Sequence, residues 1–175
     1  MADASPVFKK LNLKEQREIA VVNAPASFEP EIATLRGVTV RRSLAGAELA
    51  FSLAFVTKQL EVDALAKAVA KCAAGDAVVW FAYPKQSSKK YSSEIDRDQG
   101  WRALGKAGFE PVRMVAIDED WSAVRFRRAD YIKTLSRPAE YALSAAGKTK
   151  AGAASRGTHK AGVAREASSV RKRKR

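Results

Sequence analysis

Residues 49–56 read Leu-Ala-Phe-Ser-Leu-Ala-Phe-Val, and this segment decides the fold class of the 175-residue chain. Apart from Ser52 it is apolar at every position, so a strand formed from it would bury both of its faces. Strands of this kind lie inside parallel sheets, where helices cover the sheet on both sides. The segment therefore predicts an α/β protein with a mostly parallel sheet.

The segments on either side of 49–56 predict further strands with helices between most of them. Apolar residues recur at helical spacing from Thr57 to about Ala73. The last two strands flank a turn of three acids and read as an antiparallel hairpin. Strands that alternate with helices are joined by right-handed crossovers, so we expect a Rossmann-like sheet that ends in this hairpin. The other strands are predicted at 19–22, 38–40, 77–83, 111–117 and 122–127, and the other helices at 28–34 and 96–106.

The positive charge of the chain is concentrated at its C-terminus. The net charge is +13, and residues 137–175 hold eleven basic and two acidic residues, so this segment supplies nine of the excess charges. From Lys148 onward the composition is too poor in large apolar residues to offset the entropy of folding. We therefore expect a Rossmann-like domain over 1–136 and a basic low-complexity tail over 137–175, disordered from about residue 145.

Flexible cations neutralise phosphates and release counterions without reading base sequence. On this basis the chain is predicted to be a non-enzymatic or uncharacterised module whose tail binds nucleic acid, DNA in the first place, or another polyanion. A purely solubilising tail is the alternative. No contact with a membrane is expected, and the expected location is the cytoplasm, including the nucleoid. The residues expected to bind nucleic acid are Lys148, Lys150, Arg156, Lys160, Arg165, Arg171, Lys172, Arg173, Lys174 and Arg175.

A single cysteine and a single histidine limit the chemistry that the chain can perform. Cys72 ends an apolar helical stripe, so we expect a buried thiol in a protein of a reducing compartment. His159 lies in the tail, which excludes a histidine-based triad or zinc site inside the domain. The acids 118–120 are adjacent in one turn and diverge, so no metal site is expected there. We predict no metal, no cofactor and no catalytic residue.

Four short segments resemble known families. They are 21–25 (VVNAP), 54–57 (AFVT), 79–85 (VWFAYPK) and 115–126 (VAIDEDWSAVRF). The strand order with its closing hairpin resembles the class I methyltransferase variant of the Rossmann fold. The segments themselves resemble a bacterial family of unknown function with a degenerate form of that fold. The resemblance implies a fold and a bacterial origin, and it implies no activity and no catalytic residues.

The sequence departs from an active methyltransferase at two places. Nucleotide-binding Rossmann units need glycines after the first strand, so that the backbone can approach the ligand closely. The turn here is Asn23-Ala24-Pro25-Ala26, which has no glycine, and Pro25 also lacks an N–H donor. An acid after the second strand would bind ribose hydroxyls, but Arg41 and Arg42 stand there. We therefore do not expect S-adenosylmethionine to bind.

The alternative function is a sensor or enzyme that binds a small anion or nucleotide at the strand-end edge of the sheet, where such folds bind their ligands. Ser27 would cap the helix at 28–34 and leave free amides there, although Glu29 and Glu31 would repel a phosphate. The basic loop 85–91 is interpreted as a solvated loop, with a mobile lid or a nucleic-acid contact as the alternative. The candidate anion-binding residues are Asn23, Ser27, Arg41, Arg42, Lys58 and Lys85.

Overall fold

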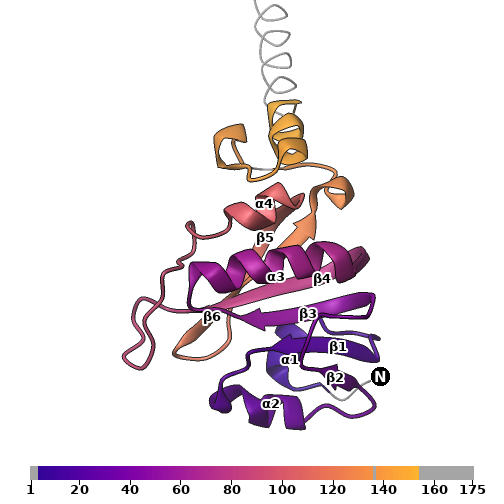
Figure 1. Cartoon of the computed structure of the whole chain (residues 1–175), viewed down its shortest axis with the longest axis vertical. Coiled ribbons are helices and arrows are strands. Elements are labelled where there is room, and N and C mark those ends of the chain that lie inside the picture. The colour runs from indigo at the N-terminus through magenta and orange to yellow at the C-terminus, as the bar shows by residue number, and fades with distance from the viewer. Residues whose placement is uncertain (1–3, 136, 154–175) are drawn as a thin grey trace, which may run out of the picture.

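The computed structural model describes residues 4–135 and 137–153, which form a six-stranded sheet covered by helices (Figure 1). The strand order is β2-β1-β3-β4-β6-β5. Strands β1 to β4 are parallel to one another, whereas β6 is antiparallel to β4 and β5. The predicted fold class, a mostly parallel Rossmann-like sheet with a C-terminal hairpin, is confirmed. The strands are β1 (Glu18–Val22), β2 (Thr39–Arg41), β3 (Leu49–Phe55), β4 (Ala73–Pro84), β5 (Phe109–Ala116) and β6 (Trp121–Arg128).

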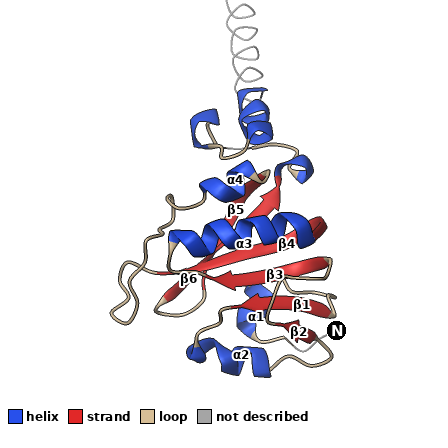
Figure 2. Cartoon of the chain, in the orientation of Figure 1, coloured by secondary structure: helices blue, strands red, loops and turns tan. Residues whose placement is uncertain are grey.

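Helices cover both faces of the sheet (Figure 2). On one face, Phe8, Phe28 and Ile32 pack in an apolar cluster with the sheet. On the other face, Val62 and Leu104 belong to a second cluster. The first layer consists of α1 (Pro6–Lys10), η1 (Ala26–Phe28) and α2 (Glu29–Ala33), and the second of α3 (Gln59–Cys72) and α4 (Arg102–Lys106). Two 3-10 helices follow the sheet, η2 (Ala129–Tyr131) and η3 (Ala139–Tyr141).

Strands β3 and β4 pack against both layers, which explains why the segment 49–56 is apolar almost throughout. Phe51 and Leu53 belong to the cluster beside α1 and α2, whereas Ala54 belongs to the cluster beside α3. Trp80 of β4 is fully buried, and its indole N–H donates to the Leu11 carbonyl at 2.7 Å. This hydrogen bond ties the end of α1 to the centre of the sheet.

The connection from β2 to β3 is a loop, residues 42–48, where parallel strands are usually joined through a helix. Leu44 of this loop is buried in the cluster beneath α3. The loop leaves a hollow of 810 Å³ beside α3, lined in part by Val22, Leu65 and Ala68. The α3 side of β1 and β2 is therefore covered by a loop and not by a helix.

Helix α4 is shorter than the helix predicted at 96–106. The Asp96 carboxylate accepts hydrogen bonds from the N–H groups of Asp98 and Gln99, both at 2.8 Å. The Trp101 indole donates to the Asp96 carbonyl at 3.0 Å. An aspartate that bonds to the backbone two and three residues on favours a turn over a helix, so residues 96–101 form a loop.

Residues 145–153 form a helix, where the composition predicts disorder. The side chain that explains this helix is Glu110 of β5, which is fully buried. Its carboxylate accepts from the N–H of Leu143 at 3.1 Å, the N–H of Ser144 at 2.6 Å and the hydroxyl of Ser144 at 2.7 Å. A Cβ on Gly105 of α4 would lie 2.6 Å from Leu143, so the segment also packs closely on α4. The rest of the predicted tail, 154–175, lies outside the described residues.

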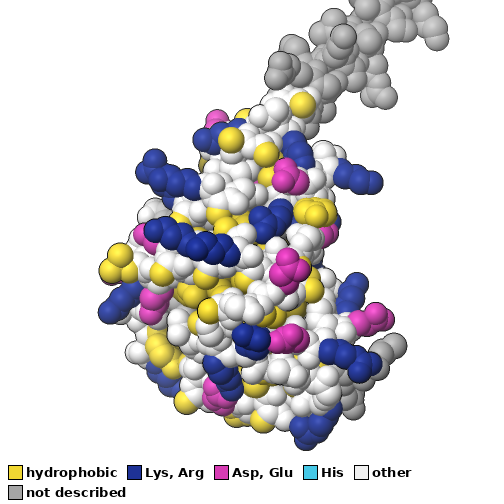
Figure 3. Space-filling model, turned by 45° about the vertical axis from the view of Figure 1, so that its right-hand side comes forward, with side chains coloured by type: hydrophobic (Ala, Val, Ile, Leu, Met, Phe, Trp, Pro, Cys, Tyr) yellow, Lys and Arg dark blue, Asp and Glu magenta, His cyan; other side chains and the backbone are white. Residues whose placement is uncertain are grey.

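Basic and acidic side chains are intermingled on the face seen in Figure 3. Several of them pair, and the shortest ion pair joins Arg127 to Asp76 at 2.5 Å. Among the described residues, no helix is both long enough and apolar enough to cross a membrane.

Candidate functional site

The carboxyl ends of β1, β2, β3 and β4 lie along one side of the sheet, which we call the carboxyl edge. Open α/β sheets bind their ligands outside this edge. The hairpin turn 117–120 lies there as well, because Trp121 pairs with Pro84 at the end of β4. The six candidate anion-binding residues are spread along this edge. Within the described residues, no hydrogen bond or ion pair joins any two of them.

Asn23 follows β1 directly and has a φ of 57°, in the left-handed region. Asparagine enters this region more readily than any other residue except glycine, because its side chain can bond locally. The turn after β1 therefore keeps the backbone shape that a glycine would give, although the sequence has none there. The Asn23 side chain is exposed at the carboxyl edge.

Arg41, the last residue of β2, and Arg42, which follows it, bond to different partners. Arg42 pairs with Glu29 of α2 through two hydrogen bonds, of 2.9 and 2.8 Å. Arg41 bonds to Glu18, at the start of β1, and to the carbonyl of Ala45. An acid is thus present at the end of β2 after all, supplied by α2 and held there by Arg42.

Ser27 lies inside η1, and it does not cap a helix. The N-cap residues of η1 and α2 are Pro25 and Phe28, and neither makes a side-chain capping bond. The sequence predicts Ser27 as the cap of a single helix. In the structure the 3-10 helix η1 begins directly after Pro25 and precedes α2, so Ser27 lies within η1. The structure therefore leaves Ser27 as an exposed hydroxyl near the β1 turn.

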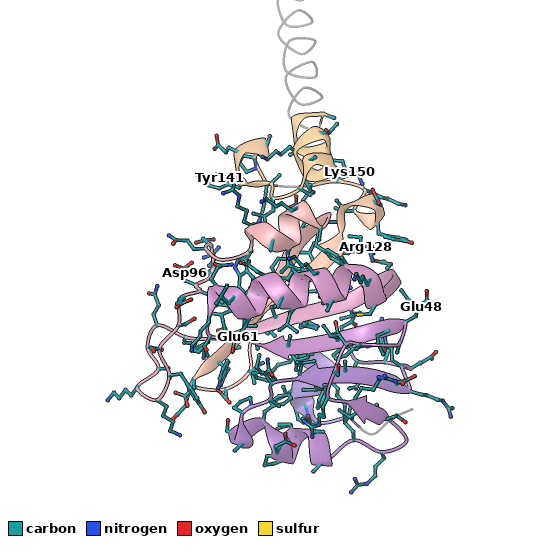
Figure 4. All side chains as sticks on the ribbon, viewed as in Figure 1. Glu48, Glu61, Asp96, Arg128, Tyr141 and Lys150 are labelled. Carbon is teal, nitrogen blue, oxygen red and sulfur yellow. The ribbon has the colours of Figure 1, made fainter. Side chains whose placement is uncertain are left out.

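Carboxylates occupy the N-terminal amides of α3. Glu61 accepts from the N–H of Thr57 at 2.7 Å and the N–H of Lys58 at 3.1 Å. Glu94, from the loop before α4, accepts from the N–H of Gln59 at 2.8 Å. Figure 4 shows Glu61 at this end of α3. These amides are taken, so Lys58 could contribute to an anion site only through its exposed ammonium group.

At the end of β4, Lys85 is tied to the hairpin turn, with its ammonium donating to the Asp118 carbonyl at 2.6 Å. Beside it lies a cavity of 550 Å³, whose lining includes Tyr83, Asp96 and Asp98. Burial raises the pKa of Tyr83, and nearby Asp96 adds to the shift. The Tyr83 hydroxyl therefore stays protonated, and it donates to the Met114 sulfur at 3.1 Å.

Of the ten candidate nucleic-acid-binding residues, the structure describes Lys148 and Lys150. Lys148 is exposed. Lys150 is partly buried, and its ammonium donates to the carbonyls of Ala129 and Ile132, the latter at 2.7 Å (Figure 4). Lys150 therefore fastens the helix 145–153 to the end of the sheet. The other eight residues, Arg156, Lys160, Arg165, Arg171, Lys172, Arg173, Lys174 and Arg175, lie outside the described residues.

Cys72 is buried at the end of α3, and this burial raises the pKa of its thiol above the ordinary value. A protonated, inaccessible thiol is a poor nucleophile. In the described part of the chain, no group of three or more His, Cys, Asp or Glu side chains could hold a metal ion.

Sequence comparisons find no match: no family model matches the chain, and no curated protein matches it significantly. Solved structures do match. A SAM-dependent methyltransferase from Aquifex aeolicus aligns with a TM-score of 0.52 and 15% identity over 73% of this chain and 90% of that one. The N-methyltransferase NodS from Bradyrhizobium japonicum WM9 aligns with 0.42 and 13% over 72% and 98%. The Methanococcus jannaschii fibrillarin pre-rRNA processing protein aligns with 0.45 and 12% over 73% and 70%.

The likeness to the Aquifex protein establishes the fold of this chain, which is that of SAM-dependent methyltransferases. The predicted function, a non-enzymatic module that binds nucleic acid, is corrected by this comparison, because the protein whose fold this chain shares is a SAM-dependent methyltransferase. That prediction gave most weight to the charge of the tail and too little to the sheet.

Sequence reasoning missed the roles of several acids. Glu29 was expected to stabilise the start of the helix at 28–34 and to repel phosphate, since nothing in the sequence pairs it with Arg42. Glu61 had a visible signal, because it stands three residues after the N-cap Lys58 and so at the position of a capping acid. Glu110 also had a visible signal, because an acid beside an apolar strand needs hydrogen-bond donors when it is buried.

Proposed function

We propose that this chain is an S-adenosylmethionine-dependent methyltransferase whose cofactor site lies at the carboxyl ends of β1 and β2. The observation that carries the proposal is the fold, a mostly parallel sheet with a closing antiparallel hairpin, which aligns with the Aquifex protein. That protein is a SAM-dependent methyltransferase. Its carboxyl edge is where ligands of such sheets bind.

Two features of the carboxyl edge fit the adenosyl part of the cofactor. The left-handed turn at Asn23 bends the chain as a glycine would. Glu29 is half-exposed beside β2, and Arg42 holds its carboxylate in place. A carboxylate has about four acceptor positions, so Glu29 can bond to Arg42 and still accept from the two ribose hydroxyls. Glu29 would thus replace the acid that the sequence lacks after β2.

Two departures weaken the site without removing it. Pro25 offers no N–H, and Ala24 and Ala26 carry methyl groups where glycines would allow closer approach. We therefore expect binding that is weaker than in a glycine-rich site. The bound cofactor would supply a methyl group carried on a positively charged sulfur. We place the acceptor molecule in the 550 Å³ cavity beyond β4, where the Tyr83 hydroxyl, which donates to Met114, can accept a hydrogen bond.

The experiment is a calorimetric titration of the full chain with S-adenosylhomocysteine. We expect one-to-one binding with a Kd below about 1 mM. Glu29→Gln should weaken binding about tenfold, because it removes charge-assisted bonds to the ribose. Glu31→Gln is the matched control on the same helix and should change little. Absence of saturable binding, or equal affinities for all three proteins, would contradict the proposal.

Two finer predictions accompany this proposal. The first is that the chain is a member of the bacterial family of unknown function that its segments resemble. The second is that the protein is located in the cytoplasm, as inferred from its single cysteine. Both stay predictions.

A further inference from the structure

The hairpin of β5 and β6 carries three arginines on one face of the sheet. Arg113 of β5 stands directly opposite Arg125 of β6 in the register. Arg127 follows two residues along β6, and alternate residues of a strand point to the same face. The three guanidinium groups therefore come from neighbouring positions, on the same sheet face as α1 and at the far end of the sheet from β1.

Only one of the three arginines has an acidic partner among the described residues. Arg127 bonds twice to Asp76, at 2.7 and 2.5 Å. Neither Arg113 nor Arg125 makes a hydrogen bond or ion pair in the described part of the chain. The Arg125 Nε is also buried without an acceptor. Burial lowers the pKa of Arg125, the nearby Arg127 lowers it further, and Asp76 offsets part of this effect.

This arrangement concentrates uncompensated positive charge on the hairpin. Like charges directly opposite on two strands are destabilising. A buried donor without an acceptor costs about 1–3 kcal/mol. Ordinary surface arginines avoid both costs by turning into solvent, which the buried Nε of Arg125 does not do.

A cavity of 410 Å³ opens beside the same hairpin, between β5 and the segment 132–137. Four arginines line it, Arg97, Arg113, Arg127 and Arg137, and its lining contains no carboxylate. Arg97 lies 3.8 Å from Asp98, too far for a strong bond. The volume of the cavity is within the range of small-ligand sites. The positive charge of its lining favours an anion that carries more than one negative charge.

We propose that this cavity binds a small soluble ligand through a phosphoryl or diphosphoryl group, held by Arg97, Arg113 and Arg137 of its lining. Guanidinium forks match phosphate oxygens with paired hydrogen bonds. Arg113 and Arg137 line the cavity and make no hydrogen bond or ion pair among the described residues, so they supply two positive charges that a phosphate dianion would neutralise. The site is separate from the cofactor site at β1 and β2, and it does not depend on it.

The test is a calorimetric titration of the full chain with pyrophosphate. We expect one-to-one binding, and at least a tenfold loss of affinity in both Arg113→Gln and Arg137→Gln. Lys89→Gln removes one charge from an exposed loop residue and should stay within about twofold of the unchanged protein. Pyrophosphate should also raise the Tm of the unchanged protein but not that of Arg113→Gln, whose own cooperative melting transition shows that the variant folds.

Two results would overturn the proposal. One is that pyrophosphate shows no saturable binding to the unchanged protein. The other is that Lys89→Gln loses as much affinity as the arginine variants, since this would mean general attraction to a positively charged surface.

Discussion

At the residue scale, Glu110 shows how one buried charge can organise a segment far along the chain. Its carboxylate accepts three hydrogen bonds from Leu143 and Ser144. Glu110→Gln replaces one acceptor oxygen by a donor that faces N–H groups. We expect the free energy of unfolding to fall by about 1–3 kcal/mol, the cost of buried unmatched donors, as measured by urea denaturation. Glu140→Gln, at an exposed position, is the control. Equal losses in the two variants would show that Glu110 does not anchor this segment.

Cys72 gives a prediction of pH dependence. Burial is the main cause that raises its pKa above the ordinary value of 9.0. Above that value the thiol ionises in the unfolded chain and stays protonated in the folded one, so stability falls as pH rises. Urea denaturation at about pH 8 and about pH 10 should show a larger fall for the unchanged protein than for Cys72→Ala. Parallel falls in both proteins would mean that Cys72 is not held protonated.

At the scale of the elements, the sheet could be predicted from the sequence and its edges could not. Segments such as 49–56 are apolar on both faces, and this property alone requires a central parallel strand. The turn at Asn23 and the pairing of Arg42 with Glu29 depend on residues that meet only in the folded chain. The helix 145–153 was not predicted, because the composition of the segment reflects only how little apolar surface it can bury. The buried Glu110 carboxylate, which accepts hydrogen bonds from Leu143 and Ser144, is not visible in that composition.

Helix 145–153 depends on a glycine at one position. A Cβ on Gly147 would meet the Glu110 carboxylate and lie 2.8 Å from the Ser144 hydroxyl. Gly147→Ala should therefore destabilise the protein by about 1–3 kcal/mol through overpacking. Gly152→Ala is the matched control, because a Cβ there meets no described atom within 4 Å, and it should be neutral or slightly stabilising. Similar Tm values for the two variants would contradict the close packing of Gly147 on Glu110.

At the scale of the whole molecule, the fold carries more functional information than the net charge. The charge of +13 predicted a nucleic-acid-binding module, whereas the fold aligns with that of a SAM-dependent methyltransferase. Of the described basic residues in the predicted tail, Lys150 bonds to backbone carbonyls of the core. The two ends of the sheet then have distinct proposed ligands, a cofactor at β1 and β2 and a phosphoryl group at β5 and β6.

The most direct test of the methyltransferase account is NMR mapping of S-adenosylhomocysteine on the isotopically labelled full chain. The account predicts shifts of the backbone amides of Asn23, Ala24 and Glu29, at the carboxyl edge. It predicts none at Arg113 and Arg125, on the distant hairpin. Amide signals that do not move at millimolar ligand, or that move only away from β1 and β2, would contradict it.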